Sequence, residues 1–143
     1  MLSTWGERIW NLADGFSGAC IGFAFYGLWT LWANHEHGFS VAARAAVLHG
    51  SISFVVTYSG TRLMRALYAL PGPRWWRFLR CVLGTLISLY TLIVAAHWLN
   101  GTPEILLTLA PGIPITVVFC VSFSWGLSQY GVAQPTPTLR TNP

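Results

Sequence analysis

The sequence predicts an all-α membrane protein, a bundle of four transmembrane helices, and three observations support this. Of the 143 residues, 54% are hydrophobic and only 8% are charged, whereas soluble domains carry about 25% charged residues. The hydrophobic residues are gathered into long runs that are nearly free of charge. Four of these runs are long enough to cross roughly 30 Å of hydrocarbon as helices rising about 1.5 Å per residue.

The predicted transmembrane domain covers residues 15–131 and is flanked by two short segments. Its four spans are expected at about 15–33, 45–61, 81–99 and 105–130. Residues 1–14 carry apolar side chains at helical spacing, which predicts either a short amphipathic helix on the cytoplasmic membrane surface or an extension of the first span. Residues 132–143 have no apolar period, so we expect a flexible cytoplasmic tail.

The fourth span is interrupted by Pro111 and Pro114. Because proline lacks a backbone N–H, a continuous helix would leave the carbonyls of Leu107 and Ala110 without their usual helical partners. Alternatively, Pro111 is the first residue of the fourth helix and residues 104–110 form a loop, in which case no carbonyl is freed. The sequence leaves both arrangements open.

The basic residues predict the orientation of the chain. All eight are arginine, and seven of them lie on one side of a four-span chain. Five of the seven follow the second span, namely Arg62, Arg65, Arg74, Arg77 and Arg80. Because positively charged residues are retained on the cytoplasmic side, both termini are predicted to be cytoplasmic (N-in/C-in) in a bacterial-type inner membrane.

Small side chains recur at steps of three and four along three of the spans. They are Gly18 and Gly22 in the first span, Gly50, Ser53, Thr57 and Gly60 in the second, and Gly84, Ser88 and Thr91 in the third. Such stripes let helix backbones approach closely. We therefore expect a tight bundle with the second and third spans as an antiparallel pair. The same stripes suit contacts between chains, so a homo-oligomer or an assembly with other membrane subunits is also expected.

Polar side chains within the second and third spans form a candidate site. His49 lies inside the second span, one helical turn before Ser53, and His97 shares a face of the third span with Tyr90. Ionisable groups inside a membrane are often functional. We interpret His49 either as a functional residue or as a structural hydrogen-bonding group.

A haem or a metal ion is the cofactor that these histidines suggest. His49 and His97 are expected at similar depth, as a bis-histidine haem requires, but on opposite sides relative to the small-residue stripes. His35, Glu36 and His37 are further metal-ligand candidates, because imidazoles and carboxylates bind metals. The same three residues also suit a solvated loop.

Arginines and tryptophans cluster around the connection between the second and third spans. The set is Arg62, Arg65, Arg74, Trp75, Trp76, Arg77 and Arg80. Interleaved cationic and aromatic side chains at a membrane surface suit anionic lipid headgroups, although the arginines could instead serve only to set the topology. A nucleic-acid partner is not expected, because the cluster is short and held at the bilayer.

The sequence carries no motif of soluble-type catalysis such as GxSxG, a P-loop or HExxH. The leading functional hypothesis is a subunit of a membrane complex, or a minimal oligomeric transporter or channel, without catalytic chemistry of its own. An alternative is a haem- or metal-binding redox subunit that uses the histidines near the outer face. A third is a membrane-embedded lipid-modifying enzyme.

Overall fold

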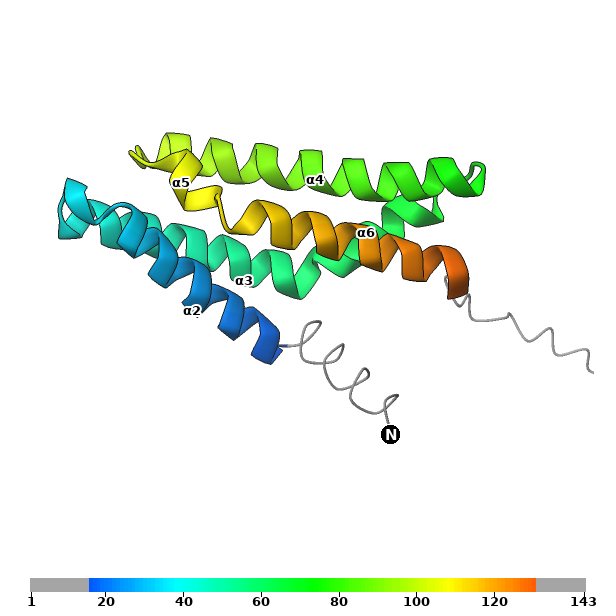
Figure 1. Cartoon of the computed structure of the whole chain (residues 1–143), viewed down its shortest axis with the longest axis horizontal. Coiled ribbons are helices and arrows are strands. Elements are labelled where there is room, and N and C mark those ends of the chain that lie inside the picture. Colours follow the sequence, from blue (N-terminus) through cyan, green and yellow to red (C-terminus); the bar gives the residue numbers. More distant parts are fainter. Residues whose placement is uncertain (1–15, 131–143) are drawn as a thin grey trace, which may run out of the picture.

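The computed structural model describes residues 16–130 and contains four helical segments long and apolar enough to cross a membrane. The elements are α2 (Phe16–Ala33), the short turn η1 (His35–His37), α3 (Phe39–Ala69), α4 (Arg74–Leu99), α5 (Ile105–Leu109) and α6 (Gly112–Tyr130) (Figure 1). The prediction of an all-helical, multi-pass membrane protein is confirmed. The helix expected over residues 1–14 and the tail over residues 132–143 lie outside the described residues.

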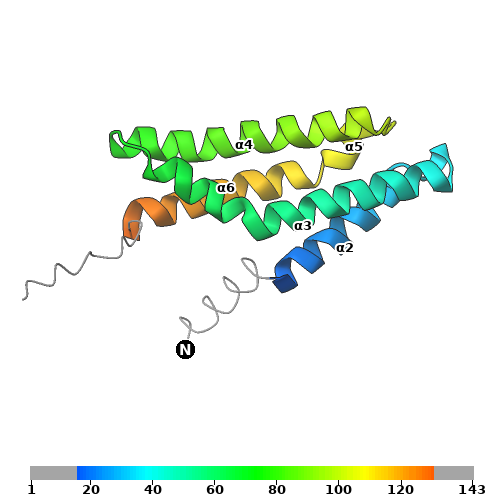
Figure 2. The same ribbon diagram turned by 180° about the vertical axis from the view of Figure 1, so that it is seen from behind.

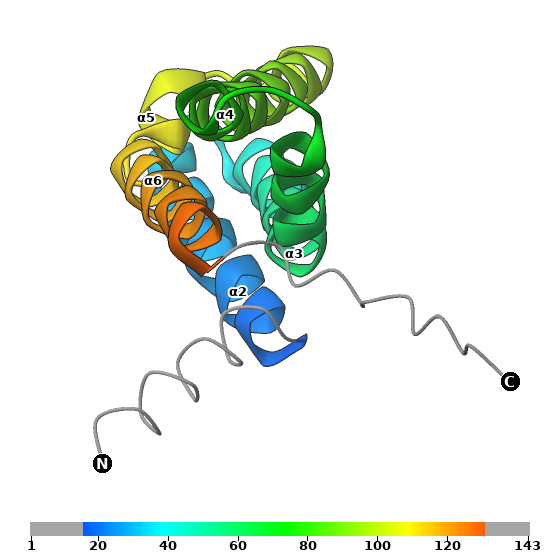
Figure 3. The same ribbon diagram turned by 90° about the vertical axis from the view of Figure 1, so that its right-hand side faces the viewer.

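The helices run up and down around one bundle. Residues 34–38 and 100–104 form two loops at the same end, which we call the loop end, and residues 70–73 form the turn end between α3 and α4. The start of α2 and the end of α6 both point toward the turn end (Figure 1). Seen from behind, α2 lies alongside the first half of α3 (Figure 2), and the view along the bundle shows α4 flanked by α3 and α6 (Figure 3).

The second and third helices are longer than the apolar runs that predicted them. α3 has 31 residues and α4 has 26, which correspond to roughly 46 Å and 39 Å of helix and exceed the hydrocarbon thickness. Hydropathy therefore located the apolar centre of each helix, whereas its polar ends are helical too.

Two arginines stabilise the turn end by satisfying carbonyls at the end of α3. Arg80 donates from Nε to the Leu67 carbonyl at 3.2 Å and from Nη2 to the Leu70 carbonyl at 2.5 Å. Arg77 donates from Nε to the Tyr68 carbonyl at 2.7 Å. The last carbonyls of a helix have no partner within the helix, so these bonds cap α3.

The fourth span is broken, in a way that differs from both arrangements considered above. Residues 105–109 form the short helix α5, the chain turns at Ala110 and Pro111, and α6 begins at Gly112 (Figure 1). The Leu107 carbonyl, which a proline at position 111 deprives of its usual partner, accepts a hydrogen bond from the Trp29 indole at 2.9 Å. The Ala110 N–H also donates to this carbonyl at 3.3 Å, so the side chain from α2 adds a second partner beside the break.

The small-residue stripe of α3 packs on α2. A Cβ built on Gly50 would lie 2.9 Å from the Phe23 carbonyl oxygen, and one built on Gly22 would lie 3.2 Å from Thr57 Oγ1. The second and third spans do pack together as expected, and a Cβ built on Gly84 would lie 3.1 Å from Leu67 on α3. The rest of the α4 stripe does not take part in this contact, because Ser88 and Thr91 are exposed.

Candidate functional site: a cavity with a histidine pair

The centre of the bundle contains a cavity of about 620 Å³ lined by α2, α3, α4 and the fourth span. It lies between two apolar clusters, with Met64 and Cys120 at one border and Leu89, Ile93 and Leu109 at the other. Small-molecule sites typically measure about 300–1,000 Å³ and are mostly apolar. The cavity therefore has the size and the wall chemistry of a ligand site.

The cavity faces the outside of the bundle between α2 and α6. α2 packs mainly on α3, and α6 packs mainly on α4, so α2 and α6 both line the cavity without forming a close pair. Ile21 on α2 is 65% exposed and Ile115 on α6 is 51% exposed, although both line the cavity. In a membrane, this side of the protein faces lipid tails.

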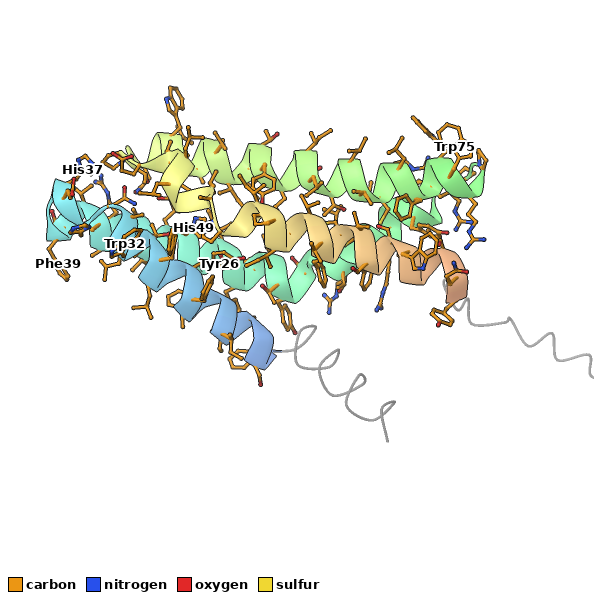
Figure 4. All side chains as sticks on the ribbon, in the orientation of Figure 1. Tyr26, Trp32, His37, Phe39, His49 and Trp75 are labelled. Atoms are coloured by element: carbon orange, nitrogen blue, oxygen red, sulfur yellow. The ribbon has the colours of Figure 1, made fainter. Side chains whose placement is uncertain are left out.

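His49 is the buried ionisable group on the cavity wall. His49 is only 4% exposed, and the centroid of its ring lies 5.5 Å from the centroid of the Tyr26 ring on α2 (Figure 4). The Nδ1 atom of His49 is hydrogen bonded, as described below, whereas its Nε2 atom has no hydrogen-bond partner among residues 16–130. A ligand in the cavity would therefore meet a free ring nitrogen.

Further polar side chains line the same cavity. Ser53 follows His49 on α3, and Tyr90 on α4 and Thr116 on α6 line the cavity as well. Thr85 is 5% exposed, and within the described part of the chain its hydroxyl has no partner. A buried hydroxyl left without a hydrogen bond is costly, so a polar atom of a ligand would be stabilised here.

His49 contacts His97 directly. The two rings are joined by a hydrogen bond of 2.7 Å between His49 Nδ1 and His97 Nε2. The other nitrogen of His97, Nδ1, is 2.9 Å from Thr102 Oγ1. The three side chains form one hydrogen-bonded row from the cavity to the loop end.

The end of α4 positions Thr102. The Thr102 N–H donates to the His97 carbonyl and the Gly101 N–H donates to the Trp98 carbonyl, each at 3.0 Å, which is the Schellman pattern of a helix end. Gly101 has φ +65°, a left-handed conformation that glycine adopts without strain. The chain therefore folds back, and the Thr102 hydroxyl lies over the histidine that precedes it by five residues.

Of the predicted polar site, the structure brings His49, Ser53 and Tyr90 to the cavity and places His97 behind His49. The similar depth of His49 and His97 allowed a pair, whereas their opposite relation to the small-residue stripes counted against it. That relation does not keep the two residues apart, because the buried residues of α4 are Cys81, Val82, Thr85, Leu89, Ile93 and His97.

Tyr26, Thr85, Thr102 and Thr116 were not predicted as site residues. For Thr102 a signal existed, because Asn-Gly-Thr directly after an apolar helix is typical of a Schellman end. For the other three, the sequence offers no signal that separates them from ordinary residues of a helix interface.

The histidines do not fit a bis-histidine haem. Nitrogen ligands lie about 2.0–2.1 Å from a metal, so two axial nitrogens are roughly 4 Å apart, with the macrocycle between them. The nitrogens of His49 and His97 bond each other at 2.7 Å. Within residues 16–130 there is no group of three side chains placed to hold a metal ion.

The loop histidines have other partners. His35 Nδ1 lies 2.6 Å from the Trp32 carbonyl, and His37 pairs with Glu104 at 3.2 Å, while Glu36 is exposed. These residues help to order the loop end instead of converging on one point.

The members of the arginine–tryptophan set have different surroundings. Arg77 and Arg80 cap α3, as described above. Trp75 and Trp76 are exposed, and Arg74 is 3.4 Å from Ser128 Oγ. Arg62 lies over the ring of Tyr58 and Arg65 over the ring of Phe123, each at 5.7 Å. Part of the cluster therefore has a structural role within the chain.

No family model matches the chain, and no curated protein or solved structure is significantly similar to it. The fold and the cavity define the class, a protein with four helices long and apolar enough to cross a membrane and a cavity between them.

Proposed function

We propose that this protein binds a membrane-dissolved amphiphile in the central cavity and serves as a minimal carrier or as a ligand-binding subunit of a membrane complex. The observation that supports this is the apolar cavity of about 620 Å³ that faces the bilayer side between α2 and α6 and has a free histidine nitrogen on its wall. The apolar walls suit an alkyl chain, and His49 suits its polar head.

We place the protein in a bacterial-type inner membrane with both termini and the turn end in the cytoplasm, because arginines gather at that end. His49 and its loop end then lie toward the outer surface. Assembly into a homo-oligomer or with other membrane subunits stays a prediction. The binding of anionic lipid headgroups by the arginine–tryptophan set at the turn end also stays a prediction.

Photolabelling tests the cavity. The full chain is reconstituted in phospholipid vesicles that contain a fatty alcohol with a diazirine on its alkyl chain, and labelled residues are identified by mass spectrometry. Thr85 is the diagnostic position, because it lines the cavity and only 5% of its surface is exposed, so lipid on the outer surface hardly reaches it. We expect labelling at Thr85.

Two leucine variants provide the control. Gly60 lines the cavity, and a Cβ there meets one atom, a Val56 methyl group at 3.9 Å, so Gly60→Leu fills the cavity without a backbone clash. Gly126→Leu makes the same change on α6, where a Cβ meets nothing within 4 Å and no cavity wall is affected. We expect Gly60→Leu to lose most labelling at Thr85 and Gly126→Leu to keep it. Equal labelling of the two variants, or none in the parent protein, would overturn the proposal.

A further inference from the structure

We propose that His49, His97 and Thr102 form a proton relay between the cavity and the loop end, and that the ligand head carries an exchangeable proton. The inference rests on the proposed function, because the relay begins at the cavity wall. It is based on the continuous row of hydrogen bonds from His49 to Thr102 and on the free Nε2 of His49.

Each member of the row has the chemistry that a relay requires. A neutral imidazole carries one N–H donor and one acceptor nitrogen, so a proton can enter at one nitrogen while another leaves from the second. A threonine hydroxyl accepts two hydrogen bonds and donates one. Thr102 Oγ1 accepts one from the Asn100 amide at 3.1 Å and has a second site for His97.

The ligand head donates a proton to His49 Nε2, and the Nδ1 proton of His49 moves to His97 Nε2. The Nδ1 proton of His97 then moves to Thr102 Oγ1, and the hydroxyl proton of Thr102 passes to water at the loop end. One proton enters and one leaves, both histidines stay neutral and change tautomer, and the reverse transfer restores the starting state.

Few charged or titratable groups surround the row. Tyr26 of α2 faces His49, Tyr90 of α4 lines the same cavity, and Arg44 of α3 donates to the Asn100 carbonyl at 2.9 Å. Among residues 16–130, no carboxylate contacts His49 or His97. A relay of neutral tautomers therefore needs no resident counter-ion, whereas a stored imidazolium would lack one.

A purely structural role is the competing explanation, since a buried histidine pair also ties α3 to α4. The two roles differ at Thr102. Thr102→Val keeps the size of the side chain, and the backbone bonds that end α4 do not use the hydroxyl. The variant should therefore fold and keep the His49–His97 hydrogen bond, but it lacks the hydroxyl through which the proton leaves the relay.

Proton exchange at the histidine rings supplies the readout. The full chain with ¹⁵N-labelled histidine is placed in bilayer nanodiscs, the ring signals are assigned with His→Gln variants, and water exchange at His49 is measured by NMR. We expect exchange at His49 to slow by about tenfold or more in Thr102→Val, because His97 then has no hydroxyl partner, and to return in Thr102→Ser.

The same variants are photolabelled with the diazirine alcohol, so that the two proposals can fail separately. Labelling at Thr85 that persists in Thr102→Val, together with slowed exchange, supports the relay. Unchanged exchange with persistent labelling overturns the relay and leaves ligand binding standing. Absence of Thr85 labelling in the parent protein overturns ligand binding, and with it the ligand-coupled relay.

Discussion

Replacing Gly50 with alanine tests how closely α2 packs on α3. The added Cβ would lie 2.9 Å from the Phe23 carbonyl oxygen and 3.1 Å from two atoms of the Phe23 ring. A carbonyl oxygen belongs to the backbone and cannot rotate away, so α2 must shift as a unit. Overpacking of this kind typically costs about 1–3 kcal/mol.

The helix itself favours alanine, and this gain must be separated from the clash. Alanine is better than glycine in a helix by about 1 kcal/mol. Gly126→Ala on α6 receives the same gain without a clash, because its Cβ meets nothing within 4 Å. The difference between the two variants is therefore the packing cost alone, about 1–3 kcal/mol or roughly 5- to 150-fold in the unfolding equilibrium.

The assay is reversible unfolding by SDS in mixed micelles, followed by circular dichroism. Gly27→Ala supplies an intermediate point, because its Cβ would lie 3.4 Å from the Ala46 carbonyl oxygen. We expect stability to rise from Gly50→Ala through Gly27→Ala to Gly126→Ala. If Gly50→Ala and Gly126→Ala agree within about 0.5 kcal/mol, the size of an ordinary surface effect, the close contact of α2 and α3 is refuted.

The same unfolding assay checks three further predictions. Asn34→Ala should destabilise the protein by about 1–3 kcal/mol, because the Asn34 amide donates to Thr108 Oγ1 at 3.0 Å; parent-like stability would contradict that role. Thr30→Val should leave stability unchanged or raise it, since the buried Thr30 hydroxyl has no partner among residues 16–130; a clear loss of stability would contradict this by indicating a hydrogen bond from that hydroxyl. Arg80→Ala should cost about 1–2 kcal/mol by uncapping α3, and more than Arg74→Ala; the reverse order would exclude capping as the role of Arg80.

The number of spans could be predicted from the sequence because hydropathy is a property of contiguous residues. The runs around Ala24, Ser53, Leu89 and Val117 are apolar enough by composition alone, whatever they pack against. The ends of the helices were harder to predict from the sequence. Arg77 and Arg80 read as charged flanks, yet the structure uses them inside α4 to cap α3, and no local pattern reports a bond to another helix.

The candidate site could be predicted from the sequence only in part. His49 attracted attention because an ionisable residue in an apolar span is rare, and Tyr90 and Ser53 do share its cavity. The pairing of His49 with His97 could not be predicted, because the two histidines lie on opposite sides relative to the small-residue stripes. On α4 the inner face instead carries Thr85, Leu89 and His97.

The sequence by itself determined that four stretches of this chain are stable in hydrocarbon, since each must bury apolar side chains and satisfy its backbone within its own helix. Only the tertiary structure decided how each helix is rotated about its axis. That rotation depends on contacts summed over all the neighbouring helices. Because several faces of each helix are nearly equally apolar, the sequence of one helix does not determine its rotation. It is the rotation of α3 and α4 that joins His49 to His97, and the position of α2 and α6 that leaves a cavity beside them.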